Sequence, residues 1–183
     1  GLGDVYKRQV YTKLMGYKAI EMIITGYQKL VKEGMDKLPE LMGDFLTASN
    51  MAGFAFGTAG CAAVHAMSYP LGGTYHVPHG ESNYALFTGV LNKYMEKKQD
   101  GEIAHLNAYL AELLHCDVRN VYAELENLLN NILPKKPLHE YGVTKEDITA
   151  FTDNVIATQG RLTANNFVPL SRDDMIDIYS KLY

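Results

Sequence analysis

The stretch YTKLMGYKAIEMIITGYQKLVKEG, residues 11–34, indicates the fold class of this chain. Its apolar residues recur at spacings of three and four, which places them on one face of an α-helix that ends at Gly34. The predicted buried stripe consists of Leu14, Tyr17, Ile20, Ile24, Tyr27 and Val31. A long amphipathic helix is therefore expected at the start of the chain.

The same helical signal continues beyond Gly34. A second helix is predicted over about 39–58, and a third carries CAAVHAMSY and ends before Pro70, because proline disfavours helix at the preceding residue. Residues 70–80 are predicted to form a loop. Glu81 then suits the first turn of a new helix, where its negative charge meets the positive end of the helix dipole.

Four further helices are predicted in the second half of the chain, at about 101–115, 118–132, 144–158 and 171–182. Asp117, Thr144 and Ser171 are the expected N-caps, and Asp147 and Asp174 stand three residues after two of them, as in a capping box. No segment shows the period of two that is typical of strands. The sequence therefore predicts an all-α, helical bundle-like domain.

Composition narrows the class of protein. The 183 residues suit one domain with a real core, and 17 basic against 21 acidic residues give a net charge of -4. This balance offers no electrostatic footprint for nucleic acid or an anionic membrane. The two cysteines, Cys61 and Cys116, form no CxxC motif, which favours a reducing cytoplasm over a disulfide scaffold.

Residues 45–64 carry no charge, but they hold too many polar and small residues for a membrane span, so a buried, tightly packed helix is expected.

Residues 1–9, GLGDVYKRQ, fit nothing that follows and are interpreted as a sequencing or cloning scar; a short native lead-in is the alternative. Residues 10–183 would then be the C-terminal, helical part of a longer protein.

Chemistry concentrates in HAMSYPLGGTYHVPHGES, residues 65–82, which holds His65, His76 and His79. Neutral imidazole suits Zn, Fe, Ni and Cu, but a lone histidine on an apolar helix is more often a hydrogen-bonded core residue. His65 and Cys61 could instead bind a structural zinc ion. Spacing alone leaves these alternatives open.

A longer run, GCAAVHAMSYPLGGTYHVPHGESNY at residues 60–84, resembles the second signature of the iron-containing alcohol dehydrogenase family, in which GxxxxH is followed by PHG. The likeness continues through ILPKKPLHEYGV and RLTANNFVPLSRDDMIDIYSKLY, and so covers the chain after residue 10. The family combines an N-terminal Rossmann-like domain with a C-terminal helical domain, and its metal lies between them. The resemblance implies that this chain is most of the helical domain, without the Rossmann-like one.

The resemblance also implies a site. His65 and His79 match two metal ligands, for Fe²⁺ first and Zn²⁺ as an alternative, while an aspartate and a third histidine of the family pattern have no counterpart here. NAD would be bound mainly by the missing domain. The chain alone is therefore expected to be inactive and to bind metal weakly.

The implied reaction is hydride transfer between NAD and a small alcohol or aldehyde, and the likeness favours 4-hydroxybutyrate, or succinate semialdehyde in reverse. Tyr69, which stands where many members carry a histidine, would be a catalytic hydrogen-bond donor or proton relay. His76 would face the substrate or remain a solvated loop residue. Arg161 would bind a substrate carboxylate or form a helix-end or interdomain salt bridge.

Two other functions stay open at this stage. The protein could be a member of the same family that acts on another alcohol or a diol, or a non-catalytic helical domain with structural histidines. The family resemblance further implies a homo-oligomer, while cysteine usage and charge balance favour a cytoplasmic protein without nucleic-acid or membrane partners.

Overall fold

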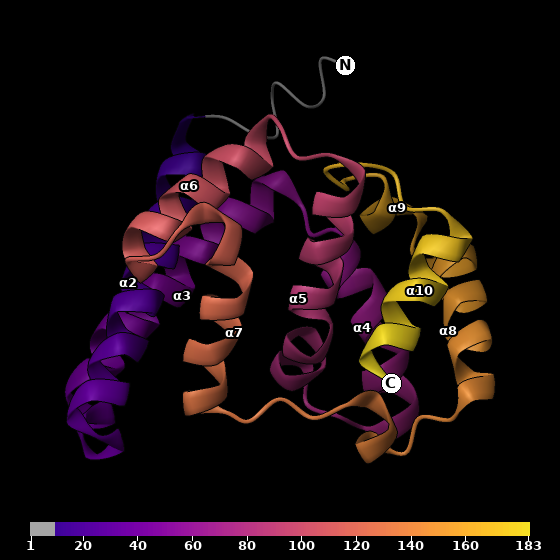
Figure 1. Cartoon of the computed structure of the whole chain (residues 1–183), viewed down its shortest axis with the longest axis horizontal. Helices are drawn as coiled ribbons and strands as arrows, with labels where there is room; N and C mark the ends of the chain where they lie inside the picture. The colour runs from indigo at the N-terminus through magenta and orange to yellow at the C-terminus, as the bar shows by residue number, and fades with distance from the viewer. Residues whose placement is uncertain (1–9) are drawn as a thin grey trace. The chain divides into compact units, whose positions relative to one another are not determined.

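The computed structural model describes residues 10–183, and every regular element in that range is a helix (Figure 1). The predicted all-α class is confirmed. The described residues form two compact units, one running up to Gly60 and resuming over Ala108–Pro134, the other holding Cys61–Asn107 and Lys135–Tyr183. Helix α6 (Glu102–Leu114) begins in the second unit and ends in the first. The interpretation of residues 1–9 as a scar lies outside the described residues.

Glycines set the packing of the first unit. Its elements are α2 (Val10–Glu33), the 3-10 turn η1 (Met35–Lys37), α3 (Leu38–Ala59), η2 (Val118–Asn120) and α7 (Val121–Ile132). A Cβ on Gly26 would lie 2.7 Å from the ring of Phe45, and one on Gly16 would lie 3.6 Å from Cβ of Ala55. The earlier residue of α2, Gly16, meets the later residue of α3, Ala55, so the two helices run antiparallel. Glycine has no side chain and allows their close approach.

The predicted stripe of α2 is only partly correct. Ile24 is buried, but Leu14 is 59% exposed and Val31 is 45% exposed, while Ala19 and Leu30 are buried instead. The interface with α3 combines the glycines of α2 with Tyr27, whose ring lies 5.4 Å from that of Phe45, centroid to centroid. Periodicity of apolar residues therefore located the helix but not its full contact face.

The expectation of a tightly buried helix over residues 45–64 is wrong for most of α3. Leu46 and Phe54 are each 66% exposed, and a Cβ on Gly53 or Gly57 would meet nothing within 4 Å. Close packing is confined to the face that meets α2. Within residues 10–183, no helix has the length and apolar character needed to cross a membrane.

The second unit is built around α4. Its elements are α4 (Ala63–Tyr75), α5 (His79–Lys97), η3 (Leu138–Tyr141), α8 (Lys145–Thr158), α9 (Gly160–Thr163) and α10 (Arg172–Leu182). Helix α4 contacts α5, α8 and α9, and α10 covers α5 and α8. The buried Tyr179 of α10 donates a hydrogen bond of 2.6 Å to the carbonyl of Met67 in α4. This contact anchors α10 to the central helix.

The predicted end of the third helix before Pro70 is wrong, and so is the predicted loop over residues 70–80. Helix α4 continues through Pro70 to Tyr75, and the connection to α5 shrinks to residues 76–78. Proline cannot donate to the carbonyl four residues earlier, which destabilises a helix interior. Here Pro70 is itself buried, beside the buried Leu71, so packing of α4 in the centre of the unit offsets that cost.

The predicted N-caps are confirmed. Thr144 and Ser171 each accept from the backbone N–H three residues on, and Asp147 and Asp174 accept from the cap N–H in return, which completes two capping boxes. Asp117 caps as well, although the helix predicted at 118–132 opens with the separate 3-10 turn η2.

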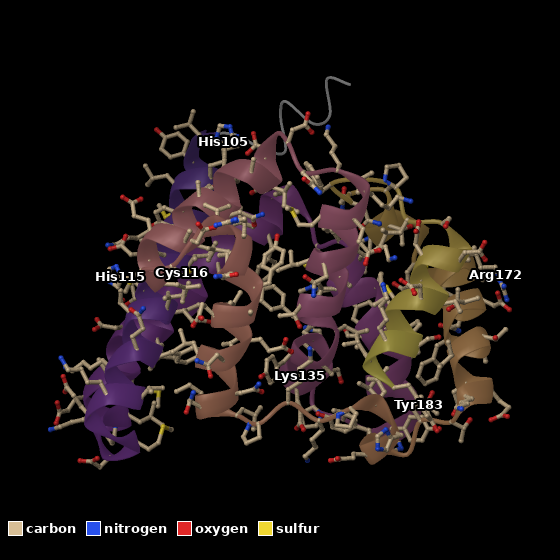
Figure 2. All side chains as sticks on the ribbon, in the orientation of Figure 1. His105, His115, Cys116, Lys135, Arg172 and Tyr183 are labelled. Carbon is tan, nitrogen blue, oxygen red and sulfur yellow. The ribbon has the colours of Figure 1, made fainter. Side chains whose placement is uncertain are left out.

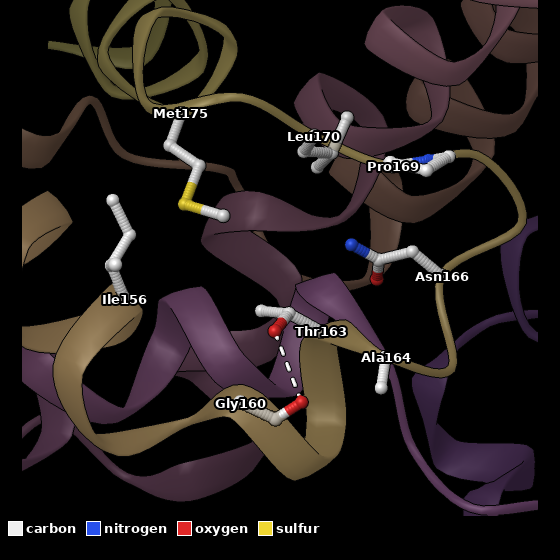
Figure 3. Close-up of a pocket in the computed structure, with 8 residues that line it drawn as sticks. All are labelled: Ile156, Gly160, Thr163, Ala164, Asn166, Pro169, Leu170 and Met175. Atoms are coloured by element: carbon white, nitrogen blue, oxygen red, sulfur yellow. Dashed lines mark hydrogen bonds between the residues drawn. The ribbon is translucent and has the colours of Figure 1, made fainter.

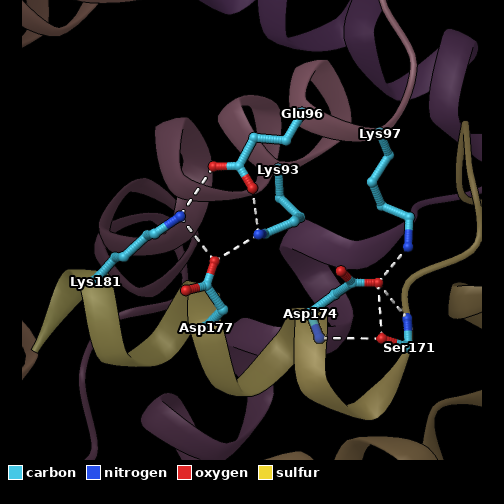
Figure 4. A network of polar contacts seen from close by, with 7 residues as sticks. All are labelled: Lys93, Glu96, Lys97, Ser171, Asp174, Asp177 and Lys181. Carbon is cyan, nitrogen blue, oxygen red and sulfur yellow. Dashed lines mark hydrogen bonds and ion pairs between the residues drawn. The ribbon is translucent and has the colours of Figure 1, made fainter.

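Ion pairs join α5 to α10 (Figure 4). Lys93, which is only 8% exposed, contacts both Glu96 and Asp177. Lys181 lies 2.9 Å from Glu96 and 2.8 Å from Asp177. The buried ammonium group is therefore compensated by two carboxylates, as a charge in a low-dielectric position requires.

Candidate metal centre

His65 lies in the first turn of α4 and is half-buried. Burial lowers its pKa, and the charge of His79 lowers it further. Because the ordinary pKa of histidine is about 6.5, the imidazole of His65 is neutral at neutral pH. A neutral imidazole has a lone pair that can bind a metal ion.

His79 is the first residue of α5, and its side chain is exposed. It follows Pro78, the N-cap of α5, whose φ of −53° is held by the proline ring. The connection from α4 is only three residues long and begins with His76 in the left-handed conformation, at φ 56°. This short, constrained turn brings the start of α5 back to α4.

The rings of His65 and His79 meet across that turn. Their centroids lie 5.3 Å apart, with an interplanar angle of 55°. Two imidazoles that bind one ion tetrahedrally through bonds of about 2.0–2.1 Å place their centroids about 5 Å apart. The separation therefore fits the coordination of one divalent metal ion by both histidines.

Tyr69 completes an aromatic cluster with the two histidines. It lies one helical turn after His65 on α4, and its ring stacks on that of His79 at a centroid distance of 6.2 Å and an angle of 30°. The side chain is 42% exposed. The structure thus brings together three of the five predicted site residues.

His76 and Arg161 are placed differently. Among residues 10–183, no hydrogen bond or ring contact joins His76 to His65 or His79, and its side chain is exposed. Arg161 is exposed on α9. Its positive charge acts on the thiol of Cys61, just before α4 begins, and lowers a pKa that burial raises.

A hydrogen bond places α9 beside the beginning of α4. The Asn165 side chain, two residues after α9, donates to the carbonyl of Cys61 at 3.0 Å. Arg161 therefore lies near the end of α4 that carries His65. Within the described range no ion pair with a carboxylate involves Arg161, and the interdomain salt bridge considered from sequence stays a prediction.

The two cysteines offer no competing metal site. Cys61 precedes α4, so it does not share a helical face with His65 as the spacing suggested. Cys116, beside His115 (Figure 2), has its pKa raised by burial, which keeps the thiol protonated. Among residues 10–183, no group of three or more His, Cys, Asp or Glu side chains is placed to hold an ion.

Sequence reasoning missed two polar residues beside the histidines. The buried Ser68 hydroxyl lies 2.7 Å from Oδ1 of Asn83 and 3.0 Å from the carbonyl of His65. Nδ2 of Asn83 lies 3.0 Å from Nε2 of His79. The spacing of His79 and Asn83, four residues apart, was visible in the sequence. The contact of Asn83 with Ser68 was not, because it forms only where α4 packs against α5.

Glu81 was the one carboxylate near the histidines in sequence, and it is engaged elsewhere. It accepts a hydrogen bond of 3.0 Å from the hydroxyl of Tyr141 and lies 3.7 Å from the ammonium of Lys136. Burial and this hydrogen bond raise the pKa of Tyr141. Glu81 therefore holds the end of η3 at Tyr141 rather than adding a third ligand beside His79.

A pocket of about 400 Å³ lies elsewhere in the same unit (Figure 3). Thr163 and Asn166 contribute polar groups to it, and Ile156, Leu170 and Met175 contribute apolar ones. The Asn166 oxygen accepts from the hydroxyl of Tyr94 at 2.9 Å. None of the predicted site residues lines this pocket.

Residues 6–183 match the model of the Fe-containing alcohol dehydrogenase family, C-terminal part. The chain belongs to this family. Over 173 residues it is 49% identical to 4-hydroxybutyrate dehydrogenase of Clostridium kluyveri, and the match covers 94% of the chain and 47% of that protein.

Other relatives agree in fold and extent. Long-chain-alcohol dehydrogenase 1 of Geobacillus thermodenitrificans is 32% identical, over 90% of the chain and 42% of that protein. An archaeal alcohol dehydrogenase from a Red Sea brine pool superposes with a TM-score of 0.82 at 23% identity, over 94% of the chain and 44% of that structure. A 1,3-propanediol oxidoreductase superposes with a TM-score of 0.81 at 21% identity, over 99% of the chain and 49% of that structure. The chain spans about half the length of the proteins it matches.

Proposed function

We propose that this chain is the helical half of an NAD-dependent dehydrogenase that interconverts 4-hydroxybutyrate and succinate semialdehyde. The observation that carries the proposal is the approach of His65 and His79 to 5.3 Å in a chain of the iron-containing alcohol dehydrogenase family. The 49% identity to a 4-hydroxybutyrate dehydrogenase supports this substrate over other alcohols.

His65 and His79 would hold the metal, Fe²⁺ first and Zn²⁺ as an alternative, with further ligands from outside the described residues. When bound, such a metal would supply Lewis-acid stabilisation of negative charge on an alcohol oxygen, and NAD, held mainly by a Rossmann-like domain, would supply the redox chemistry. The role of the two helices is to bring both imidazoles to one point before the metal binds.

Tyr69 would act on the substrate side of His79. Its phenol hydroxyl can donate a hydrogen bond or pass on a proton. Its ring stacks on that of His79 and is 42% exposed, so a small molecule bound beside His79 can reach the phenol. This position supports a catalytic role in moving the hydroxyl proton of the substrate.

Arg161 would bind the carboxylate of 4-hydroxybutyrate. Its guanidinium can form two parallel hydrogen bonds with a carboxylate, and it lies by the end of α4 that carries His65. His76, exposed on the α4–α5 connection, would contact the substrate as well. We further propose that the whole protein is a cytoplasmic homo-oligomer.

Steady-state kinetics of the whole protein test this function. The protein would be loaded without oxygen with Fe²⁺ or Zn²⁺, and NAD reduction followed with 4-hydroxybutyrate, ethanol and 1,3-propanediol. The highest kcat/KM is expected for 4-hydroxybutyrate. A higher kcat/KM for ethanol or the diol would show that 4-hydroxybutyrate is not the preferred substrate. If no alcohol supports NAD reduction and chelators do not change the stability of the protein, the histidines would instead be structural.

A further inference from the structure

We propose that the pocket formed by α8, α9, α10 and the segment 164–170 binds a small neutral carbonyl compound, an aliphatic amide, through the side chain of Asn166. The pocket of about 400 Å³ lies within the second unit, and small-molecule sites commonly enclose about 300–1,000 Å³. None of the described residues proposed for the metal or the substrate lines it. The inference therefore stands without those assignments.

The amide nitrogen of Asn166 is the observation that points to a ligand. Nδ2 is shielded from solvent, and within residues 10–183 it has no hydrogen-bond partner. Figure 3 shows this nitrogen directed into the space between Thr163, Leu170 and Met175. A shielded donor without a partner costs free energy, which an acceptor atom placed in the pocket would recover.

Tyr94 sets the orientation of this amide. Its hydroxyl donates to Oδ1 of Asn166 at 2.9 Å, which leaves Nδ2 on the side of the pocket. Tyr94 is itself 7% exposed, and its ring packs edge-on against Phe167 at a centroid distance of 6.1 Å. The donor is therefore held in place before a ligand arrives, which reduces the entropy lost on binding.

The neighbouring polar side chains use their donors within the protein. Asn165 donates to the carbonyl of Cys61 at 3.0 Å. The hydroxyl of Thr163 donates to backbone carbonyls one helical turn earlier, at 3.2 Å for that of Gly160. Among the described side chains that line the pocket, Asn166 is therefore the one with a donor to offer a ligand.

The rest of the lining defines the ligand. Ile156, Leu170 and Met175 favour an aliphatic part, and Nδ2 of Asn166 requires an acceptor, because an amide nitrogen only donates. Among residues 10–183, no side chain that lines the pocket is charged. A carboxylate or an ammonium would lose hydration there without gaining an opposite charge. A neutral carbonyl oxygen on a short aliphatic chain meets all of these conditions.

The first test compares three probes of similar length: pentanamide, pentanoate and pentylammonium. Each is titrated into the ¹⁵N-labelled 183-residue chain, and the side-chain amide signals are followed by NMR. Pentanamide should shift the Asn166 signals to saturation, with a Kd about fivefold or more below those of the two ions. The Asn165 amide, which is already bonded to Cys61, is the internal control and should shift far less. Tighter binding of either ion, or a shift that does not saturate, would overturn the proposal.

The second test removes the donor. Asn166→Asp keeps an oxygen for the hydroxyl of Tyr94 but has no N–H to offer, so the Kd for pentanamide, followed through the backbone amide of Ala164, should rise about tenfold or more. A Kd within about twofold of that of the unmodified chain would show that the Asn166 amide does not bind the carbonyl group.

The third test changes the charge preference of the pocket. Ile156 is 48% exposed near the end of α8, so Ile156→Lys adds an ammonium at the pocket wall without disturbing the core. The Kd for pentanoate should fall about threefold or more. Val118→Lys adds the same charge at an equally exposed residue of the first unit and should leave all three Kd values unchanged.

Equal responses of Ile156→Lys and Val118→Lys would place binding outside this pocket and overturn the proposal. Should Asn166→Asp fail to fold, the probe comparison on the unmodified chain and this matched pair of variants still decide the question.

Discussion

The imidazole of His65 lies 5.3 Å, centroid to centroid, from that of His79, although the two residues belong to different helices. This approach depends on a connection of three residues between α4 and α5 and on the long continuation of α4 past Pro70. Two imidazoles at this spacing can share one metal ion. Their relationship is the basis of the predictions about activity.

Removal of either histidine should strip the metal from the whole protein. His65→Ala and His79→Ala each delete one ligand, and we expect loss of stoichiometric metal by elemental analysis together with loss of NAD-dependent turnover. His76→Ala is the matched control for metal content alone, because His76 lies on the same connection outside the contact between the His65 and His79 rings. Full metal content in both ligand variants would contradict the assignment.

Tyr69→Phe should separate proton movement from metal binding. The phenyl ring keeps the stacking on His79 but cannot donate a hydrogen bond. Because positioned acid–base groups contribute about 10²–10⁴-fold to rate, we expect kcat to fall by about 10²-fold while metal content stays unchanged. An unaltered kcat would show that the phenol has no part in the reaction.

Arg161→Met should affect carboxylated substrates selectively. A hydrogen-bonded ion pair is worth about 1.5–3 kcal/mol, so KM for 4-hydroxybutyrate should rise by about 10–100-fold. The KM for butan-1-ol, which lacks the carboxylate, should remain the same. For Arg161→Lys, the KM for 4-hydroxybutyrate should lie between those of the unmodified protein and Arg161→Met. Equal changes for both alcohols would instead indicate a structural role.

Acidification should destabilise the second unit through its ion pairs. Hydrogen bonds from Lys93 and Lys181 lower the pKa of the Glu96 carboxyl, and hydrogen bonds from Lys181 and Lys93 lower that of Asp177. A carboxyl whose pKa is lower in the folded state stabilises the fold above its unfolded pKa of about 4 and loses this contribution as pH falls through the folded pKa.

We therefore expect Tm, followed by circular dichroism, to decline on acidification below about pH 4. The double variant Glu96→Gln with Asp177→Asn has no carboxyl to protonate at this network, so its Tm should start lower and decline less steeply. Parallel declines in both proteins would show that other carboxyl groups dominate the acid response.

Ser171→Ala should weaken α10 by removing its cap. The Ser171 hydroxyl accepts from the N–H of Asp174 at 3.1 Å, and loss of such a cap costs about 1 kcal/mol. Urea unfolding should show this loss. Ser180→Ala, an exposed substitution within the same helix, should leave the free energy of unfolding nearly unchanged; an equal loss there would argue against the cap.

Much of the local structure followed from the sequence alone. The N-caps at Thr144 and Ser171 were predictable because a capping box is a contact between residues three apart. The helix over residues 10–33 was predictable from its apolar period. Its full contact face was not, because α3 also packs against Gly16 and Gly26 of α2, which an apolar period does not mark.

The sequence by itself determined the all-helical class, most helix boundaries and, through the PHG motif, His65 and His79 as a pair. Only the tertiary structure decided that α4 continues through Pro70, since burial in the second unit offsets the missing backbone hydrogen bond. It also decided the contact between Ser68 and Asn83, because side chains on two helices meet only after those helices pack. Contacts between residues near each other in the sequence can be predicted from the sequence, whereas the geometry of the site depends on the packing of separate helices.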